Sequence, residues 1–356
     1  MSYARYQRRG AAALLLLILM VPLLGLLAFS VDYGFLLYIK TELQRTADQA
    51  AIAAVMDLQP DSYGNQDLDK VRATVKTMVE LNLGDGFRVE NSDIEIGRFN
   101  PSTICENIQL LNTGTFDTVR VTVRRDGISN ASVSLFFSRI IGHDTSGVVA
   151  ASTAILQRAR FLGPGAKVFP FAIEQISWNK LAQGQTATIY GDGSIEDEFG
   201  RKIPGNWGTV DIGPASNSTT SLSDQIRNGL TQADLDSLKE QNAITSSDYI
   251  DASITIDLNG DTGLSAGLKH AVQYVEGEVR VAPIYRHTTG GGGTLFYEIV
   301  GWVTVEVVGS SWNGSIKSSI EVRKSFTYDA NLLPSVDLTD TTNTIEGAYT
   351  SPVLIQ

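Results

Sequence analysis

The side chains that most often form disulfides or bind transition metals are scarce in this chain: one cysteine and three histidines in 356 residues. Because Cys105 has no second cysteine to pair with, a fold held by disulfides within the chain is excluded. His143, His270 and His287 lie far apart in the sequence and do not have metal-ligand spacing. We therefore expect no metal site and no cofactor.

Common catalytic motifs are missing as well. The chain has no Gly-x-Ser-x-Gly, no His-Glu-x-x-His and no Cys-x-x-Cys sequence. We therefore predict no catalytic residues, no small-molecule substrate and no enzymatic activity. A triad can also assemble from distant positions, so a membrane-tethered hydrolase stays an alternative.

Basic residues are outnumbered. The chain has 28 Lys and Arg against 39 Asp and Glu, a net charge of −11 at pH 7. Arg5, Arg8 and Arg9 are the only charged residues among the first ten, so the rest of the chain is more acidic than this total. Nucleic-acid binding needs a basic face. The composition therefore argues against a nucleic-acid partner.

Against these absences stands one long apolar run, residues 11–31, which contains no charged side chain. About 20 apolar residues in a helix cross the hydrocarbon core of a bilayer, and a proline such as Pro22 is tolerated there. Arg5, Arg8 and Arg9 precede the run, so the positive-inside rule predicts a cytoplasmic N-terminus. Residues 1–10 would be cytoplasmic, 11–31 would be a single membrane span, and the remainder would lie on the far side of the membrane.

A cleaved signal peptide is the alternative reading of this run. Its apolar region is normally about 7–15 residues and is followed by a small-x-small cleavage site. The run here is longer, and the residues that follow Val31 continue in a helical pattern. A retained anchor fits the sequence better.

Residues 32–59 predict a helical stalk that continues the span. Small and apolar residues recur on one side at helical spacing, and Gln59-Pro60 ends the pattern. A solitary spacer helix is one interpretation. The other is a packing surface, because a stripe of small side chains lets a second helix approach closely. The candidate packing residues are Leu43, Ala47, Ala50 and Ala54.

These N-terminal motifs resemble the TadE/TadG-like proteins of the Flp (tight adherence) pilus-assembly system. The resemblance rests on Arg8-Arg9-Gly10-Ala11, the apolar run, Val31-Asp32-Tyr33-Gly34, Thr41-Glu42-Leu43-Gln44 and Ala47-Asp48-Gln49-Ala50-Ala51. The motif residues of the stalk are thus Thr41, Glu42, Leu43, Gln44, Ala47, Asp48, Ala50 and Ala51. Weaker similarities follow at Val119–Val123, Leu135–Phe137, Ile140–Gly142, Gly205–Gly208 and Asn228-Gly229.

The resemblance implies a membrane-anchored, non-catalytic component of a type IV-like pilus, either minor-pilin-like or anchoring. It would span a bacterial inner membrane once, with its ectodomain periplasmic or extracellular. Its partners would be other pilus-assembly or pilin-like subunits, inner-membrane components and the lipid bilayer, in a system linked to adhesion and secretion. A membrane-tethered adhesin or ligand-binding ectodomain is the alternative function.

Two positions depart from the family pattern. Prepilin-type substrates have a glutamate five residues after the cleavage-site glycine, whereas Leu15 occupies that place after Gly10. Gly10 is thus either a processing site or a backbone residue at the membrane edge. Longer TadG-like proteins carry a von Willebrand A domain with an Asp-x-Ser-x-Ser motif, which this sequence lacks. The chain therefore resembles the short form.

The rest of the sequence predicts an α+β ectodomain with mainly antiparallel strands. We expect a first unit over 60–162, a second over 163–329 after Gly163-Pro164-Gly165, and a polar C-terminal segment over 330–356 that is a loose tail or an edge segment. Expected helices lie at 68–79, 133–141, 222–230, from Thr231 and at 264–275, and expected strands at 87–98, 117–124, 147–157, 185–191, 277–286, 295–308 and 315–328.

One stretch could be mistaken for a metal site. Asp257-Leu258-Asn259-Gly260-Asp261 resembles the start of a calcium loop, but the sixth and twelfth positions hold Thr262 and Leu268 in place of glycine and an acid. We interpret it as a turn that leads into the next helix. A soluble fragment from residue 60 onward is accordingly expected to fold without metal.

Overall fold

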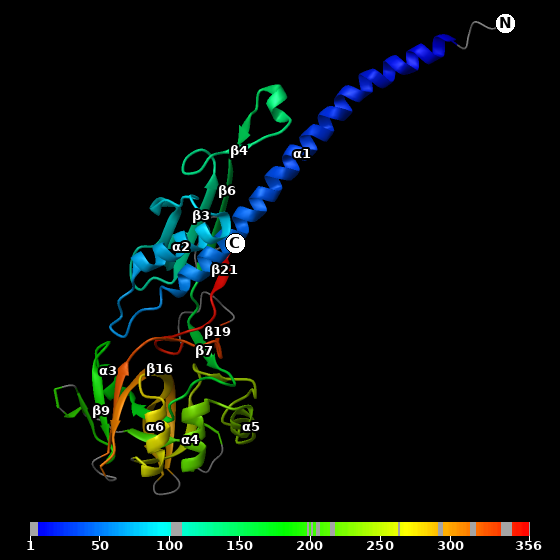
Figure 1. Cartoon of the computed structure of the whole chain (residues 1–356). Coiled ribbons are helices and arrows are strands. Elements are labelled where there is room, and N and C mark those ends of the chain that lie inside the picture. Colours follow the sequence, from blue (N-terminus) through cyan, green and yellow to red (C-terminus); the bar gives the residue numbers. More distant parts are fainter. Residues whose placement is uncertain are drawn as a thin grey trace.

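A single long helix dominates the computed structural model. The structure describes residues 6–100, 109–197, 199–200, 202–203, 207–213, 218–262, 264–290, 295–313, 318–335 and 344–355, with side chains in the first helix from Leu14 onward. Helix α1 (Tyr6–Met56) contains 51 residues, roughly 75 Å of helix. Figure 1 shows its N-terminal half extending away from the body of the molecule, while its C-terminal half lies against the first of two folded units.

The first unit is an antiparallel sheet covered by helices. Its strand order is β2-β1-β3-β6-β21, and every pairing is antiparallel. The elements are α2 (Leu68–Leu83), η1 (Asn91–Asp93), β1 (Ile94–Phe99), β2 (Leu110–Leu111), β3 (Thr118–Arg125), β6 (Val148–Ile155) and β21 (Val353–Ile355). The C-terminal half of α1 and α2 share one apolar core with the sheet.

Strand β3 confirms the expected alternation. Val119, Val121 and Val123 are fully buried on the core face, while Arg120 and Thr122 on the other face are half-buried. The expected helix at 68–79 is confirmed by α2, which is capped by Asp67 and ends at Gly84. These two elements can be predicted from short-range sequence patterns because each pattern repeats the period of a strand or a helix several times.

Residues 133–141 do not form the expected amphipathic helix. They belong to a hairpin that we call the arm (Val133–Ser146): β4 (Val133–Ser134) pairs with β5 (Thr145–Ser146), and η3 (Ser138–Ile141) lies near its tip. Val133 and Leu135 are buried, but Phe136 and Ile140 are exposed, so no continuous apolar face packs on the protein. Gly142, with φ of 89°, ends the short η3.

The second unit is built on a nine-stranded sheet among the described residues, in the order β11-β10-β9-β17-β16-β14-β12-β8-β15. Strand β15 also pairs with β16, so β16, β14, β12, β8 and β15 close into a small ring. The strands are β8 (Phe171–Glu174), β9 (Thr186–Tyr190), β10 (Ile195–Asp197), β11 (Lys202–Ile203), β12 (Trp207–Val210), β14 (Ile256–Thr262), β15 (Val279–Thr289), β16 (Leu295–Ser311) and β17 (Ser319–Lys324).

Short helices pack against this sheet on two apolar clusters. They are α3 (Gln175–Lys180), α4 (Thr219–Asn228), α5 (Gln232–Glu240), η4 (Ala266–Leu268) and α6 (Lys269–Tyr274). Thr231 and Asp234 form the expected capping box at the start of α5, since each side chain accepts the other's backbone N–H.

Residues 257–261 are part of strand β14, so the expected turn is wrong. Ile256 and Leu258 are buried on one face and Asp257 and Asp261 are exposed on the other, which is the alternation of a half-buried strand. The strand pairs with β16 from Ile256 to Gly260. Acidic residues at alternate positions therefore mark the solvent face of a strand here.

The C-terminal segment returns to the first unit. Its described part forms β19 (Leu332–Pro334), β20 (Ala348–Tyr349) and β21; β19 joins β7 (Ala159–Leu162) and β13 (Ile250–Asp251), and β20 pairs with β18 (Thr327–Tyr328). Strand β21 is the edge strand beside β6, and Figure 1 shows the C-terminus next to α1. Of the two readings of 330–356, these pairings match the edge segment.

Candidate functional site

The first part of α1 presents apolar side chains to the outside on every face. From Leu14 to Val31 the large apolar side chains are all exposed, Leu14, Val21 and Leu26 by 67–69%. In the described residues one helix is long and apolar enough to cross a membrane, and its most apolar window has no buried residue. A core helix of a soluble protein would bury one face. This stretch is therefore complementary to lipid rather than to the protein's own core.

Asp32, directly after the apolar run, is bound by the arm. The Phe136 backbone N–H donates to Oδ1 at 2.7 Å, and the Phe137 N–H, the Ser138 N–H and the Ser138 hydroxyl donate to Oδ2 at 3.0, 2.6 and 2.7 Å. The carboxylate is 2% exposed. Burial raises the pKa of Asp32, but the hydrogen bonds from Ser138, Phe136 and Phe137 outweigh it and hold the pKa below its usual 3.8.

This Asp32 contact was not predicted from the sequence, which indicated only that Asp32 ends the span. The partner residues lie 104 to 106 positions away. The available signal was a lone acid at the end of an uncharged run, with Phe35 one turn later. The Phe35 ring meets the Phe136 ring edge-on at a centroid distance of 5.2 Å, so the arm is fixed to α1 by both a polar and an aromatic contact.

The predicted packing stripe is buried inside the chain's own fold. Leu43 is 1% exposed and Ala47, Ala50 and Ala54 are 0% exposed, and α1 contacts β3, β6 and α2. The residues do form a packing surface, but the assignment of that surface to another molecule is wrong. The alanines are small because a helix lies directly on a sheet there.

Among the other stalk motif residues, Gln44 connects α1 to the same sheet, whereas Thr41 and Glu42 form hydrogen bonds within α1. Gln44 Nε2 donates to Asp48 Oδ1 at 2.9 Å and to the Ala151 carbonyl on β6 at 3.0 Å. Ala51 is buried, the Thr41 hydroxyl donates to the Leu37 carbonyl, and the Glu42 carbonyl accepts from Thr46. Arg8, Arg9 and Gly10 lie in α1 without described side chains, and Arg5, Cys105 and Gly205-Asn206 lie outside the described residues.

Residues 10–57 match the family model described as "Putative Flp pilus-assembly TadE/G-like". This segment is TadE/G-like. No curated protein and no solved structure matches the chain. The match covers the apolar run, Asp32 and the buried stripe, and it points to a role in Flp pilus assembly. The region after residue 57 lies beyond the match.

One side of the TadE/G-like segment is left exposed beyond the apolar run. We call it the outer face; it consists of Leu37, Tyr38, Thr41, Arg45 and Gln49. Leu37 is 49% and Tyr38 62% exposed, and the spacing of three to four residues places the set on the side of the helix opposite the sheet. The outer face is the part of the stalk that another protein can contact.

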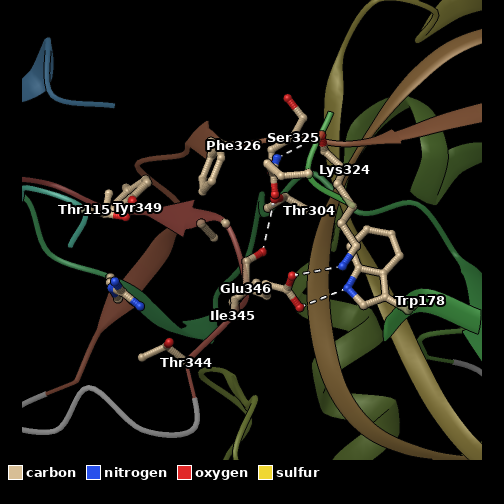
Figure 2. A pocket seen from close by; sticks show the side chains of 14 residues that line it. Thr115, Trp178, Thr304, Lys324, Ser325, Phe326, Thr344, Ile345, Glu346 and Tyr349 are labelled. Carbon is tan, nitrogen blue, oxygen red and sulfur yellow. Dashed lines mark hydrogen bonds and ion pairs between the residues drawn. The ribbon is translucent and has the colours of Figure 1, made fainter. Parts of the chain in front are cut away.

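A pocket of about 220 Å³ lies where the C-terminal segment crosses between the two units. Figure 2 shows Glu346 pointing at Trp178 and Lys324. The Trp178 Nε1–H donates to Glu346 Oε2 at 2.9 Å, and the Lys324 Nζ lies 3.5 Å from Glu346 Oε1 and 4.5 Å from the Trp178 ring centroid. These charges pair with each other, so the arrangement holds the C-terminal segment in place.

A buried acidic pair lies near the start of α5. Gln225 Nε2 donates to Asp211 Oδ1 at 3.0 Å and to Asp234 Oδ1 at 3.4 Å, while Asp211 Oδ2 is buried without a partner. Burial, and secondarily the charge of Asp234, raises the pKa of Asp211 to about 6. Within the described residues no group of three or more His, Cys, Asp and Glu side chains could hold a metal ion.

Proposed function

We propose that the protein is a membrane-anchored structural component of the Flp pilus-assembly apparatus, minor-pilin-like or anchoring, which acts by assembly and not by catalysis. The observation that carries the proposal is the arrangement of the TadE/G-like segment. One continuous helix presents a lipid-compatible surface over Leu14–Val31, then a stripe that holds its own ectodomain, and opposite that stripe an outer face.

The proposed orientation has the N-terminus in the cytoplasm and both folded units outside the inner membrane. It is supported by the arginines that precede the apolar run, which the positive-inside rule assigns to the cytoplasmic side. Alkaline phosphatase fused after Gln356 should be active, since it would be exported with the ectodomain. An inactive fusion together with an active cytoplasmic reporter at the same position would contradict this orientation.

The proposed partners are pilus-assembly or pilin-like subunits that pack on the outer face and on the membrane span. A helix of this kind offers side chains at three- and four-residue spacing to a neighbouring helix. Tyr38 and Arg45 are the most informative positions, because both are exposed and lie beyond the apolar run.

Site-specific photo-crosslinking in intact cells tests these contacts. A photoreactive residue at Tyr38 or Arg45 should capture a pilus-assembly protein. The matched control is Leu81, which is 76% exposed on α2 and should not capture the same protein. If Tyr38 and Arg45 capture no pilus component in cells that assemble pili, the proposed packing role is wrong.

A further inference from the structure

The arm has an unusual surface for a segment so firmly held at its base. Phe136 is 61%, Phe137 42% and Ile140 83% exposed, although Asp32 and Phe35 hold the backbone of the same turn against α1. A group of neighbouring apolar side chains that a fixed backbone holds exposed marks a surface that contacts a lipid bilayer or another protein. Figure 1 shows the arm rising beside α1 in the direction of its N-terminal half.

The position of the arm along α1 favours the lipid bilayer as the surface that it contacts. Leu14–Val31 spans about 27 Å of helix at 1.5 Å per residue, close to the ~30 Å thickness of a hydrocarbon core. Asp32 therefore lies at the boundary of the membrane, and the arm is bonded to Asp32 itself. Tyr33, the next residue, is 54% exposed, as expected for an aromatic residue at a membrane interface.

The space between the arm and α1 is suited to lipid headgroups. A groove of about 450 Å³ is lined by Phe35 and Phe136 and by the arginines Arg125 and Arg139. Arg139 is paired only loosely with Asp144, at 3.7 Å between exposed side chains. Two arginines and two aromatic rings in one groove match the chemistry of an anionic headgroup and the start of its acyl chain.

We propose that the arm is a second membrane contact: Phe137 and Ile140 insert into the outer leaflet next to α1, and Arg125 and Arg139 bind the phosphates of anionic lipids. The protein would then hold the membrane at two points, which fixes the tilt of α1 and the orientation of the ectodomain above the bilayer. The inference rests on the proposed membrane anchoring of α1. The test below measures the anchor and the arm at separate positions, so that either one can fail on its own result.

Spin labels on the full chain in lipid nanodiscs measure the depth of each position. In a Cys105→Ser background, single cysteines replace Ile140 on the arm, Leu19 in the apolar run, and Leu81 on α2 as an exposed apolar control. Accessibility to oxygen and to a water-soluble nickel complex is compared for the three labels in phosphatidylethanolamine–phosphatidylglycerol nanodiscs.

The label at Ile140 should be shielded from nickel several-fold more than the label at Leu81, and the label at Leu19 more strongly still. A shielded Leu19 with an Ile140 label as accessible as Leu81 would overturn the membrane contact of the arm and leave the anchor intact. An accessible Leu19 would overturn both the anchor and the inference.

Lipid charge tests the role of the arginines. Replacing phosphatidylglycerol by phosphatidylcholine should reduce the shielding at Ile140, and Arg139→Gln should reduce it in the anionic nanodiscs to the same extent. Equal shielding at Ile140 in both lipids would overturn the assignment of the groove to anionic headgroups. Circular dichroism of each variant verifies that the ectodomain is folded.

Discussion

Asp32 connects two segments that the sequence places more than a hundred positions apart. Its two carboxylate oxygens accept hydrogen bonds from the turn Phe136–Ser138, and its backbone belongs to the helix that leaves the apolar run. A carboxylate is suited to this position because it accepts several donors at once and does not itself need to donate. One side chain therefore fixes the arm to the end of the apolar run.

The Asp32→Asn substitution tests this role. An asparagine has one acceptor oxygen, and its NH₂ group would face backbone N–H donors. We expect amide hydrogen exchange at Phe136–Ser138 to become several-fold faster while exchange in β3 is unchanged. Ser138→Ala is the matched control, because it removes a single donor and should have a smaller effect. Unchanged exchange in Asp32→Asn would contradict the account.

Asp211 is expected to make the stability of the second unit depend on pH. Its pKa of about 6 lies above its usual 3.8, so the folded state binds the proton more tightly than the unfolded state. The stabilisation from this group is complete below about pH 4 and is lost as the pH rises through about 6. Each pKa unit corresponds to about 1.4 kcal/mol, so the loss should be about 1–3 kcal/mol.

The measurement is the free energy of unfolding of wild type and Asp211→Asn at pH 4 and pH 8. The variant cannot ionise at position 211, so its free energy of unfolding relative to that of wild type should be higher at pH 8 than at pH 4. Asp224→Asn, at an exposed position beside Gln225, should show no such increase. A constant difference between Asp211→Asn and wild type would contradict the raised pKa.

At the scale of elements, α1 is both an anchor and a core helix. The small side chains of α1 resemble a helix–helix contact surface, but they pack against β3 and β6. There an alanine lets the axis of α1 approach the sheet closely. Residues on the buried side of α1 therefore stabilise the fold, and residues on its exposed side are available to a partner.

Ala50→Leu and Ala54→Leu should destabilise the ectodomain. Extra methylenes in a packed core cost about 1–3 kcal/mol at each site, and both alanines are fully buried. Urea unfolding of a fragment that begins at Tyr33 should show the loss. Gln49→Leu adds the same side chain at an exposed neighbour and should change stability by less than about 0.5 kcal/mol. Undiminished stability of the double variant would contradict the observed packing.

Elements with a repeating local pattern could be predicted from the sequence, whereas long-range contacts could not. The alternation of β3, the helix period of α2 and the capping box of α5 are each written in consecutive residues. The arm and β14 were mispredicted because a few apolar or acidic residues match two periods equally well. The pairing of β21 with β6 leaves no local signal, and the lone acid at position 32 does not identify its partners in the arm more than a hundred residues away.

For the molecule as a whole, the first unit is assembled from both ends of the chain. Core residues come from α1 at one end and from Tyr349 and Leu354 near the other. The division at residue 60 that the sequence indicates therefore cuts through a shared core. The site could be predicted only in part: the sequence identifies the segment and its small-residue stripe, but not that the chain's own sheet covers that stripe.

A pair of soluble fragments tests whether the first unit needs α1 for its core. Residues 33–356 retain the part of α1 that contains Leu43, Ala47 and Ala50, whereas residues 60–356 lack it. The longer fragment should give a single dispersed NMR spectrum with protected amides in β3 and β6. The shorter one should lose protection in those strands and keep it in β16. Equal protection of β3 in both fragments would show that α1 is dispensable for the first unit.

Piliation of a deletion strain tests the proposed function most directly. Cells that lack the chain are complemented either with the full chain or with residues 33–356 exported behind a cleavable signal peptide, and surface pili are quantified at matched protein levels. The account predicts that deletion abolishes pili, that the full chain restores them, and that the exported but unanchored fragment does not. Normal piliation in the deletion strain, or full rescue by the unanchored fragment, would contradict a membrane-anchored role in pilus assembly.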